Sequence, residues 1–374
     1  MTSATKLPLD RVLAWRMRRQ FLDRPEGASA ERIVGRLCGV QAQVAASAEQ
    51  AVAARRPAAA EGEAARALEQ RKLIKVWAMR GTLHLLTPDD AAACLSLLAA
   101  ARTWEKGAWQ KTFATVAQMD AIAEAVREVL HDAVLTREQL AARILERTRD
   151  DSPAELLGSG WGAVLKPLAW QGLLCNGPSD GTRVTFTSPA TWLDGWTGLP
   201  DPETAAARVI PAYLGAYGPA TMDTFDQWLI RGASRKASLR RWFAALTDAG
   251  ELSEVIVDGR QAFARTADVA GIAAAEHFPG VRLLPAFDQF VLGPGTRNEE
   301  IIAAHRRPLI SKAAGWISPV VVSGGRVAGT WESGDDGITV TLFPEAGPVS
   351  HEDLTAEAGR LTKTTGVTVR TAPG

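Results

Sequence analysis

The sequence predicts an α+β protein that is mainly helical, in which a group of helices followed by a short hairpin recurs along the chain. Three observations lead to this prediction. Apolar residues recur at helical spacing through much of residues 1–275. Paired strand-like runs interrupt these helices at intervals of about a hundred residues, which indicates a loose internal repeat. Residues 276–374 contain several runs rich in β-branched residues, which are typical of strands.

The clearest repeat lies at residues 116–200. Apolar positions from 122 to 130 predict a first helix. Thr136 is placed to cap a second helix, because Ser and Thr side chains accept a hydrogen bond from a free N–H of the first turn. A third helix is expected over 162–174, and an extended run over 183–187 follows it after a Pro- and Gly-containing turn.

The same order recurs at residues 201–275. Helices are expected over 205–217, 222–229 and 238–249. The pair Asp258-Gly259 then separates two strand-like runs, and this is the strongest short signal for a hairpin. Three helices followed by a hairpin are typical of a winged-helix unit, in which the hairpin is the wing.

Residues 1–115 fit this pattern less closely. Helices are expected over 9–22, over 29–40 with Ser29 as the N-cap, and over 62–69. Residues 75–86 suggest two strands around a bend at Gly81. We therefore predict three tandem winged-helix units, of which the first is elaborated.

The C-terminal region, residues 276–374, is expected to form a separate β-rich domain. Four strand-like runs are present, and a last helix is expected over 356–362. Ser323-Gly324-Gly325 reads as a tight turn between two of these strands. The runs cover 281–288, 319–322, 326–331 and 338–342.

The composition excludes several classes of protein. The 42 Lys and Arg residues balance the 42 Asp and Glu residues, so a nucleic-acid partner would require basic residues clustered on one face. The longest nearly apolar stretch, 91–101, is too short to span a membrane. No signal peptide is apparent, and the three cysteines lie far apart without metal-ligand spacing. We expect a cytoplasmic protein without a metal, another cofactor or a membrane partner.

Winged helices usually bind DNA through the third helix and the wing, and phosphate contacts supply much of the affinity. Some winged helices instead serve as protein-interaction modules, so a scaffold remains an alternative. The densest basic run lies in the third unit, beside Trp228 and Trp242, although a solvated helix face is the simpler interpretation of any one residue. The run comprises Arg231, Arg235, Lys236, Arg240 and Arg241.

No common motif of nucleotide-binding, hydrolytic or zinc enzymes is present. Five short motifs in a fixed order nevertheless resemble the AlkZ-type winged-helix DNA glycosylases, from Leu9 to about Leu342. They are Gln41-Ala42-Gln43, Arg80-Gly81-Thr82-Leu83-His84, Gly218-Pro219-Ala220-Thr221 with Phe225 and Trp228, Leu283-Leu284-Pro285-Ala286-Phe287-Asp288, and the stretch from Gly315-Trp316 to Thr330-Trp331.

This resemblance implies that the three winged helices and the β-rich domain form a C-shaped cradle for DNA. It also implies excision of N7-alkylguanine lesions, including the unhooking of interstrand cross-links. The catalytic Gln-X-Gln of the family corresponds to Gln41 and Gln43. The intervening Ala42 replaces a residue that is usually a larger aliphatic. Gln43, where another branch has an acid, places the chain in the AlkZ-like branch, which includes antibiotic self-resistance proteins.

The spacing of the two glutamines makes a structural demand. Side chains two residues apart on an α-helix point about 200° away from each other, so both amides cannot face one pocket. The sequence therefore predicts that the helix ends or kinks near Gln41. Otherwise the two residues are ordinary amides on a helix surface.

The chemistry of an amide limits what this pair can do. An amide cannot act as a base near neutral pH, so it can orient a water and stabilise a positively charged sugar through its carbonyl dipole. An N7-alkylguanine is cationic and already a good leaving group, so this limited help suffices. No lysine lies near Gln41 and Gln43 in the sequence, and we expect a monofunctional glycosylase that leaves an abasic site.

The expected partner is double-stranded DNA carrying an alkylated guanine, bound by a monomer. The lesion itself is left open between a simple alkyl group, a bulky monoadduct and a cross-link. The alternative function is a non-catalytic winged-helix regulator. Candidate DNA contacts include the C-terminal turn, as a probe of the minor groove. These candidates are Arg80, His84, Arg235, Lys236, Arg240, Arg241, Lys312, Gly324, Gly325 and Arg326.

Overall fold

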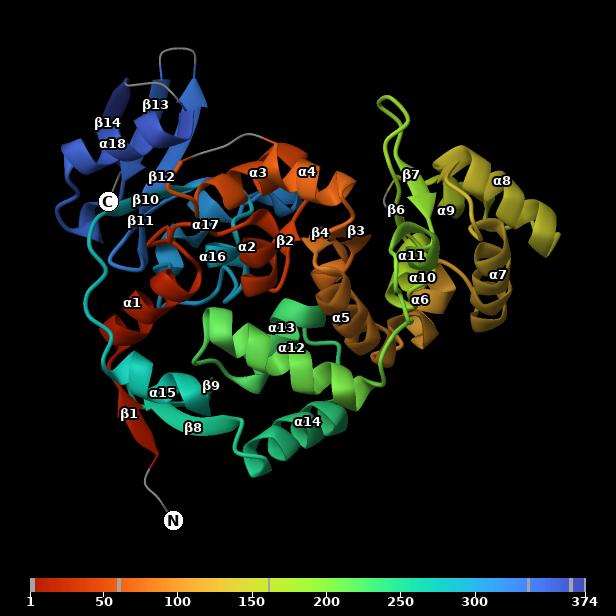
Figure 1. The fold of residues 1–374 in the computed structure, drawn as a ribbon, viewed down its shortest axis with the longest axis horizontal. Helices are drawn as coiled ribbons and strands as arrows, with labels where there is room; N and C mark the ends of the chain where they lie inside the picture. Colours follow the sequence, from red (N-terminus) through yellow and green to blue (C-terminus); the bar gives the residue numbers. More distant parts are fainter. Residues whose placement is uncertain (1–3, 59–61, 161, 335–336, 363–365, 373–374) are drawn as a thin grey trace.

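The structure is a computed structural model that describes residues 4–58, 62–160, 162–334, 337–362 and 366–372. Its architecture is mixed α+β, with four small sheets set among helices (Figure 1). Three sheets have three strands each, in the orders β2-β4-β3, β5-β7-β6 and β1-β8-β9. The fourth has the order β10-β11-β12-β13-β14. Among the described residues, no helix combines the length and apolar character that crossing a membrane would require.

The N-terminal third begins with β1 and α1, which lie outside its three-stranded sheet, and continues with that sheet and the helices around it. Its elements are β1 (Thr5–Leu7), α1 (Leu9–Arg19), α2 (Ala30–Arg36), β2 (Val40–Gln41), α3 (Ala45–Ala53), α4 (Glu63–Glu69), β3 (Ile74–Trp77), η1 (Met79–Gly81), β4 (Leu83–Leu86), α5 (Pro88–Ala100), η2 (Thr103–Glu105) and α6 (Gly107–Thr112).

Ser29 caps α2 as expected, because its side chain accepts a hydrogen bond from the N–H of Arg32. The helix ends earlier than the sequence suggested, and α3 was not expected. Cys38 and Gly39 adopt left-handed backbone angles, which end the helix, and a Cβ at Gly39 would lie 2.7 Å from Leu86. This turn sends the chain into β2 instead of a longer helix.

The second region confirms the expected helix starts. Thr115 and Thr136 each form a capping box with the glutamine three residues later. The third helix is shorter than the expected 162–174. The elements are α7 (Val116–Val129), β5 (Leu135–Thr136), α8 (Arg137–Thr148), α9 (Ala154–Gly158), α10 (Leu165–Trp170), β6 (Cys175–Asn176), β7 (Thr185–Thr187) and α11 (Pro189–Trp192).

The third region contains the expected hairpin. Asp258 and Gly259 both have left-handed angles and join β8 to β9. The N-terminal strand β1 adds to this sheet in parallel with β8, which the sequence did not indicate. The elements are α12 (Pro202–Tyr217), α13 (Met222–Ile230), α14 (Lys236–Asp248), β8 (Leu252–Val257), β9 (Arg260–Arg265) and α15 (Thr266–Ala273).

The C-terminal region has the predicted strands and one more, β14, which pairs in parallel with β13. A second difference is that the last helix begins five residues earlier than expected, at His351. The elements are β10 (Val281–Leu284), α16 (Gln289–Leu292), η3 (Ala304–Arg306), α17 (Arg307–Ile310), η4 (Ala313–Gly315), β11 (Val320–Ser323), β12 (Arg326–Gly334), β13 (Gly337–Leu342), η5 (Pro344–Ala346), α18 (His351–Thr362) and β14 (Val367–Thr371).

One order of elements recurs: helix, strand, helix, helix, strand, strand. It runs from α2 to β4 and, with α9 added, from α7 to β7. It runs again from α12 to β9, where a bridge between Ala220 and Phe263 takes the place of the first strand. Helix α1 lies outside the first of these groups, contrary to the expectation for residues 9–22. Its apolar residues Leu13 and Met17 share a core with the C-terminal region.

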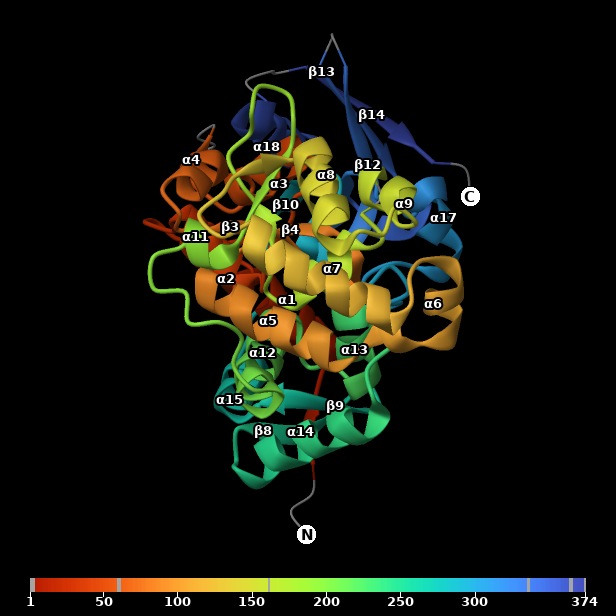
Figure 2. The ribbon, with the colours of Figure 1, turned by 90° about the vertical axis from the view of Figure 1, so that its right-hand side faces the viewer.

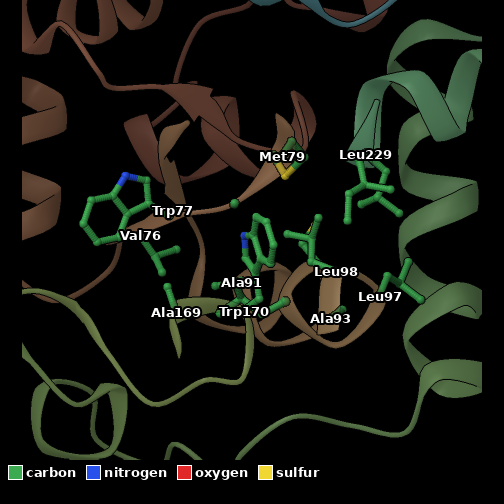
Figure 3. Close-up of a cluster of buried hydrophobic side chains, with 14 of the residues drawn as sticks. Val76, Trp77, Met79, Ala91, Ala93, Leu97, Leu98, Ala169, Trp170 and Leu229 are labelled. Atoms are coloured by element: carbon green, nitrogen blue, oxygen red, sulfur yellow. The ribbon is translucent and has the colours of Figure 1, made fainter. Parts of the chain in front are cut away.

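The largest hydrophobic core joins all three groups of elements. In Figure 3, Val76, Trp77 and Met79 of the first sheet region lie near Leu97 and Leu98 of α5 and Trp170 of α10. Trp77 also stacks on Phe186 of β7, with ring centroids 5.7 Å apart. Figure 2 shows α7 and α8 at the side of the molecule that is on the right in Figure 1. This continuous packing fixes the first sheet against its neighbours.

Candidate catalytic cavity

Gln41 is the last residue of β2, and it faces His84 across the antiparallel ladder to β4. The N–H of Ala42 donates to the Leu83 carbonyl at 2.8 Å. The chain then bends through Gln43 and Val44 and enters α3. The prediction that the helix is broken near Gln41 is therefore confirmed.

The two glutamine side chains have different surroundings. Gln41 is 7% exposed, and its Oε1 is buried without a hydrogen-bond partner among the described residues. Gln43 is exposed, and its Oε1 accepts a hydrogen bond of 3.4 Å from the N–H of Leu83. The Gln41 Oε1 is therefore an acceptor without a partner in the described part of the chain, and it is shielded from solvent in this orientation of the amide.

Gln41 lies in the wall of a cavity of about 910 Å³. The cavity is bounded by α1, β2 and η1, by the chain from Tyr217 through α13, by the tip of the β8–β9 hairpin, and by residues between Phe287 and Ile317. Within the described part of the chain, residues 116–200 contribute nothing to the wall. Gln43 is not among the lining residues either.

Positive charge dominates this cavity, although the chain as a whole is neutral. Six arginines line it, against two glutamates, Glu299 and Glu300. A concave site lined by one sign of charge concentrates oppositely charged ligands. The predicted clustering of basic residues is therefore present, and the ligand that it favours is anionic. The arginines are Arg16, Arg80, Arg231, Arg260, Arg297 and Arg307.

Arg80 occupies a left-handed backbone position in η1, directly before the strand that carries His84. Its Nη1 donates to the carbonyls of Trp228 at 3.3 Å and Leu292 at 3.4 Å. Its Nη2 is buried and has no partner among the described residues. Burial lowers the pKa of Arg80 to about 10, so the guanidinium remains charged at neutral pH.

His84 is fully buried. Its Nδ1 lies 3.0 Å from the Thr82 carbonyl, which can only accept, so Nδ1 carries the proton and Nε2 is an acceptor. Nε2 has no partner in the part of the chain that the structure describes. Burial, and secondarily the charge of Arg80, lower the pKa of His84 to about 3. The ring is thus neutral at physiological pH.

Two ion-pair networks join the elements that form the cavity. Arg16 of α1 donates to the Gly218 and Pro219 carbonyls at 3.2 and 2.8 Å and to Glu300 at 2.7 Å. At the end of α3, Arg55 forms two 2.7 Å hydrogen bonds with Asp288, and both side chains are completely buried. These contacts join the N-terminal helices to the third and C-terminal regions. The wall that contains Gln41 is thereby held against the walls formed by those two regions.

Comparison with known proteins identifies relatives of nearly the whole chain. A family described as DNA glycosylase AlkZ-like matches residues 34–364. An interstrand DNA cross-link repair glycosylase from Streptomyces sahachiroi is 47% identical over 358 residues, which are 95% of this chain and 96% of the relative. The chain belongs to the AlkZ-like DNA glycosylase family.

A solved structure of the Streptomyces sahachiroi DNA glycosylase AlkZ matches with a TM-score of 0.93 at 45% identity, covering 98% of this chain and 100% of that chain. The resemblance drawn from five sequence motifs is confirmed. The protein is a DNA glycosylase, and DNA is its substrate. The excess of arginines in the cavity of this AlkZ-like glycosylase is consistent with a polyanionic substrate.

Four predicted DNA contacts of the AlkZ-like glycosylase lie away from Gln41. Arg235, Lys236, Arg240 and Arg241 are on or beside α14, which packs against α12, α13 and β8 and contributes no described residue to the cavity wall. Two of them already have acidic partners. Lys236 pairs with Asp223 and Asp226, and Arg241 pairs with Glu203 at 2.6 Å.

The C-terminal turn differs from its expected geometry. Gly325 is buried against α1, and a Cβ there would lie 2.7 Å from Leu13. A Cβ at Gly324 would lie 3.6 Å from the His277 ring. Arg326 donates to the Glu300 carbonyl at 2.7 Å. Because Gly325 packs on α1, the turn does not project freely, as a probe of the minor groove would.

Lys312 is exposed and follows Ser311, which lines the cavity. Three exposed arginines that line the cavity of this AlkZ-like glycosylase were not among the predicted DNA contacts: Arg260, Arg297 and Arg231, of which only Arg231 had been named, as part of the basic run. All three are exposed at the cavity and have no ion pair with another described residue. The Asp258-Gly259 turn could have pointed to Arg260, since this residue follows the turn directly at the tip of the β8–β9 hairpin. No local signal marked Arg297.

Proposed function

We propose that this AlkZ-like glycosylase hydrolyses the N-glycosidic bond of N7-alkylguanine in double-stranded DNA, including bulky adducts and interstrand cross-links, and leaves an abasic site. The observation that carries the proposal is the buried, unpartnered Gln41 Oε1 in the wall of an arginine-lined cavity. Buried polar atoms are nearly always hydrogen-bonded, so an exception in a cavity indicates a place for water or substrate. The cross-link repair activity in the name of the 47% identical relative supports the extension to cross-links.

The proposed chemistry needs no strong acid or base. A water held by the side-chain carbonyl of Gln41 attacks C1′ of the damaged nucleotide, and Gln43, which lies outside the cavity wall in this structure, is proposed to approach that water when DNA is bound. The C1′–N9 bond breaks, and its electron pair neutralises the cationic purine as it departs. The amide carbonyl dipoles stabilise the positive charge that develops on the sugar. The water loses its extra proton to solvent.

His84 acts in this proposal as a positioning residue for Gln41. Residues opposite each other on neighbouring strands point to the same face, with Cβ atoms about 5 Å apart. The neutral His84 ring offers Nε2 as an acceptor. If the Gln41 side-chain amide is turned by half a turn, its NH2 group takes the buried position that Oε1 holds and can donate to this nitrogen. That arrangement satisfies both buried atoms and directs the Gln41 carbonyl oxygen into the cavity.

A monofunctional reaction is supported by the chemistry of the cavity wall. A glycosylase that also cleaves the strand needs an amine to form a Schiff base with the sugar. Among the described residues, the wall contains arginines but no lysine. Because the guanidinium remains protonated and is a poor nucleophile, we propose that the reaction ends at the abasic site.

The finer description of the fold is also a proposal. The recurring order of elements supports three winged-helix units, and the cavity between the first, the third and the C-terminal region supports a C-shaped cradle for DNA. The predicted boundaries, 1–115, 116–200, 201–275 and 276–374, and the monomeric state stay predictions. The packing of α1 on the C-terminal core supports assigning the first helix of the first unit to α2.

Base release from a defined lesion tests the function. We expect purified protein to release free 7-methylguanine from a duplex carrying one N7-methylguanine, with the strand left intact. Gln41→Ala should slow release by about 100-fold, as loss of one stabilising group in such a site does, and Gln43→Ala should also slow it. Gln50→Ala is the matched control, because Gln50 is an exposed amide on α3.

Equal release by wild type and Gln41→Ala would contradict the proposed role of this residue. Tight binding that does not depend on the lesion, with no base released from any alkylated duplex, would favour the alternative of a non-catalytic regulator. The family comparisons do not favour that alternative.

A further inference from the structure

Trp316 is an exposed aromatic side chain at the edge of the cavity. It lies in the loop between α17 and β11, directly after η4, and it is 44% exposed. Indole side chains are mostly buried in folded proteins, and those left at a surface are enriched at binding interfaces. The exposure of Trp316 beside a DNA glycosylase cavity therefore calls for a functional explanation.

The loop around Trp316 is held by its own backbone. Ser311 and Ile317 form an isolated β-bridge, and the Lys312 N–H donates to the Trp316 carbonyl at 2.9 Å. Ala314 and Gly315 adopt left-handed angles that close the turn. Since the backbone on both sides is fixed, the position of the indole is set before any ligand binds.

Phe287 supports the indole from the cavity side. The two rings meet edge to face, with centroids 5.0 Å apart and an interplanar angle of 77°. Phe287 is itself a cavity-lining residue in a left-handed conformation, which is unusual for an aromatic residue and is often kept at functional sites. The edge-to-face contact occupies part of the indole, and the exposed remainder is available to a ligand.

The neighbours of Trp316 connect it to the cavity and to positive charge. Gly315 and Ile317 both line the cavity, and so does Arg307 of α17. Lys312 is exposed in the same loop, and the described residues offer it no acidic partner. An aromatic face beside cations that can hold phosphates is the combination that binds unstacked nucleic-acid bases.

We propose that Trp316 is a stacking platform at the mouth of the cavity that receives a planar aromatic face from lesion-containing DNA. The face comes either from a base unstacked next to the lesion or from the ring system of a bulky adduct. In both cases the platform holds the duplex distorted while the damaged nucleotide reaches Gln41. The proposal rests on the proposed function for the identity of the lesion, whereas DNA as the substrate follows from the family.

Three substitutions separate stacking from simple apolar contact. Trp316→Phe keeps a planar ring, Trp316→Leu keeps apolar area without one, and Trp316→Ala removes both. Val369→Ala is the control, since Val369 is similarly exposed but lies on the edge strand β14. Because Trp316 is exposed, all variants should keep the wild-type melting temperature, which is measured first.

Binding and single-turnover excision are then measured with three duplexes. One carries N7-methylguanine, one carries an N7-guanine adduct with an aromatic ring system, and one carries a non-cleavable abasic analogue with 2-aminopurine as its neighbour. Base stacking on an aromatic side chain contributes enough affinity that its loss weakens binding by roughly 10-fold. We expect that loss in Trp316→Ala and Trp316→Leu, with most affinity kept in Trp316→Phe and Val369→Ala.

The pattern across duplexes identifies the source of the aromatic face. Weaker binding to the N7-methylguanine and abasic duplexes, with loss of 2-aminopurine quenching, assigns the platform to a neighbouring base. Weaker binding to the bulky-adduct duplex alone assigns it to the adduct. Wild-type binding of all three duplexes by Trp316→Ala and Trp316→Leu would overturn the proposal. If the wild type binds the abasic duplex but releases no alkylated base, the proposed function fails and the 2-aminopurine measurement still decides the role of Trp316.

Discussion

Gln41 and His84 lie opposite each other between β2 and β4, and each has one buried polar atom that no described residue satisfies. Both residues come from motifs that are short and separated by about forty positions in the sequence, and the ladder brings them together. An unsatisfied buried polar group destabilises a fold by about 1–3 kcal/mol. The proposed half-turn of the Gln41 amide removes this cost, because its N–H then donates to Nε2 of His84.

The first prediction concerns the stability of Gln41→Ala. We expect this variant to lose about 1–3 kcal/mol of stability, because it removes the amide that is proposed to donate to the buried Nε2 of His84 and leaves that acceptor without a partner. Release of 7-methylguanine should fall at the same time by about 100-fold. Thermal unfolding and single-turnover excision on the same preparation check this. A variant as stable as the wild type would contradict the proposed hydrogen bond from Gln41 to His84.

The second prediction concerns pH. His84 has its pKa lowered by burial, and next by Arg80, to about 3, whereas an unfolded histidine titrates near 6.5. Between these values the unfolded chain binds one more proton, so stability is lost as the pH falls from about 6.5 toward 3. This residue alone should remove about 2 kcal/mol between pH 7 and pH 5.

His84→Leu should therefore flatten this part of the stability profile, measured by urea unfolding at both pH values. His131→Leu is the control, because His131 is exposed on the surface beside Asp132 and should keep the wild-type slope. An unchanged slope in His84→Leu would show that the ring is not buried as a neutral group.

The third prediction concerns the buried pair Arg55–Asp288. Asp288→Ala should cost about 3–5 kcal/mol of stability, because it leaves a fully buried guanidinium without its counter-charge. The double variant Arg55→Met, Asp288→Leu should recover much of this loss, since two apolar side chains need no charge partner. Urea unfolding midpoints of the three proteins check the order. Equal midpoints for the single and double variants would contradict it.

The fourth prediction compares two neighbouring cations on α14. Lys236 is paired with Asp223 and Asp226, whereas Arg235 has no ion pair within the described chain. Arg235→Ala should therefore weaken binding to an undamaged duplex and lower the slope of log affinity against log salt by about 1. Lys236→Ala should change that slope much less. Titrations over a range of salt concentrations measure both, and equal slopes would remove α14 from the DNA-binding surface.

Much of the local structure followed from the sequence. The Thr136–Gln139 capping box, the Asp258-Gly259 turn and the bend at Gly81 all appear where they were expected. These signals act through the dihedral angles and hydrogen bonds of a few consecutive residues, so no distant contact is needed to read them. The end of the helix before Gln41 was predictable, because the side chains of Gln41 and Gln43 could not both face one pocket from an intact helix.

Other features depended on contacts between distant parts of the chain. No sequence signal indicated that β1 joins β8, that α1 packs on the C-terminal core, or that β14 extends the last sheet. In each case several segments have similar apolar patterns and could be the packing partner. The complete core determines which segment is. The basic run on α14 was evident in the sequence, but its distance from Gln41 was not.

By itself, the sequence determined the positions of the helix caps and turns, the extended conformation at Gln41 and, through its motifs, the family to which the protein belongs. Only the tertiary structure decided which arginines surround Gln41, that His84 is buried and neutral, and that Trp316 remains exposed at the cavity. The reason is that caps and turns need a few neighbouring residues. A cavity needs side chains such as Arg16 and Glu300, which are 284 positions apart, to meet at one place.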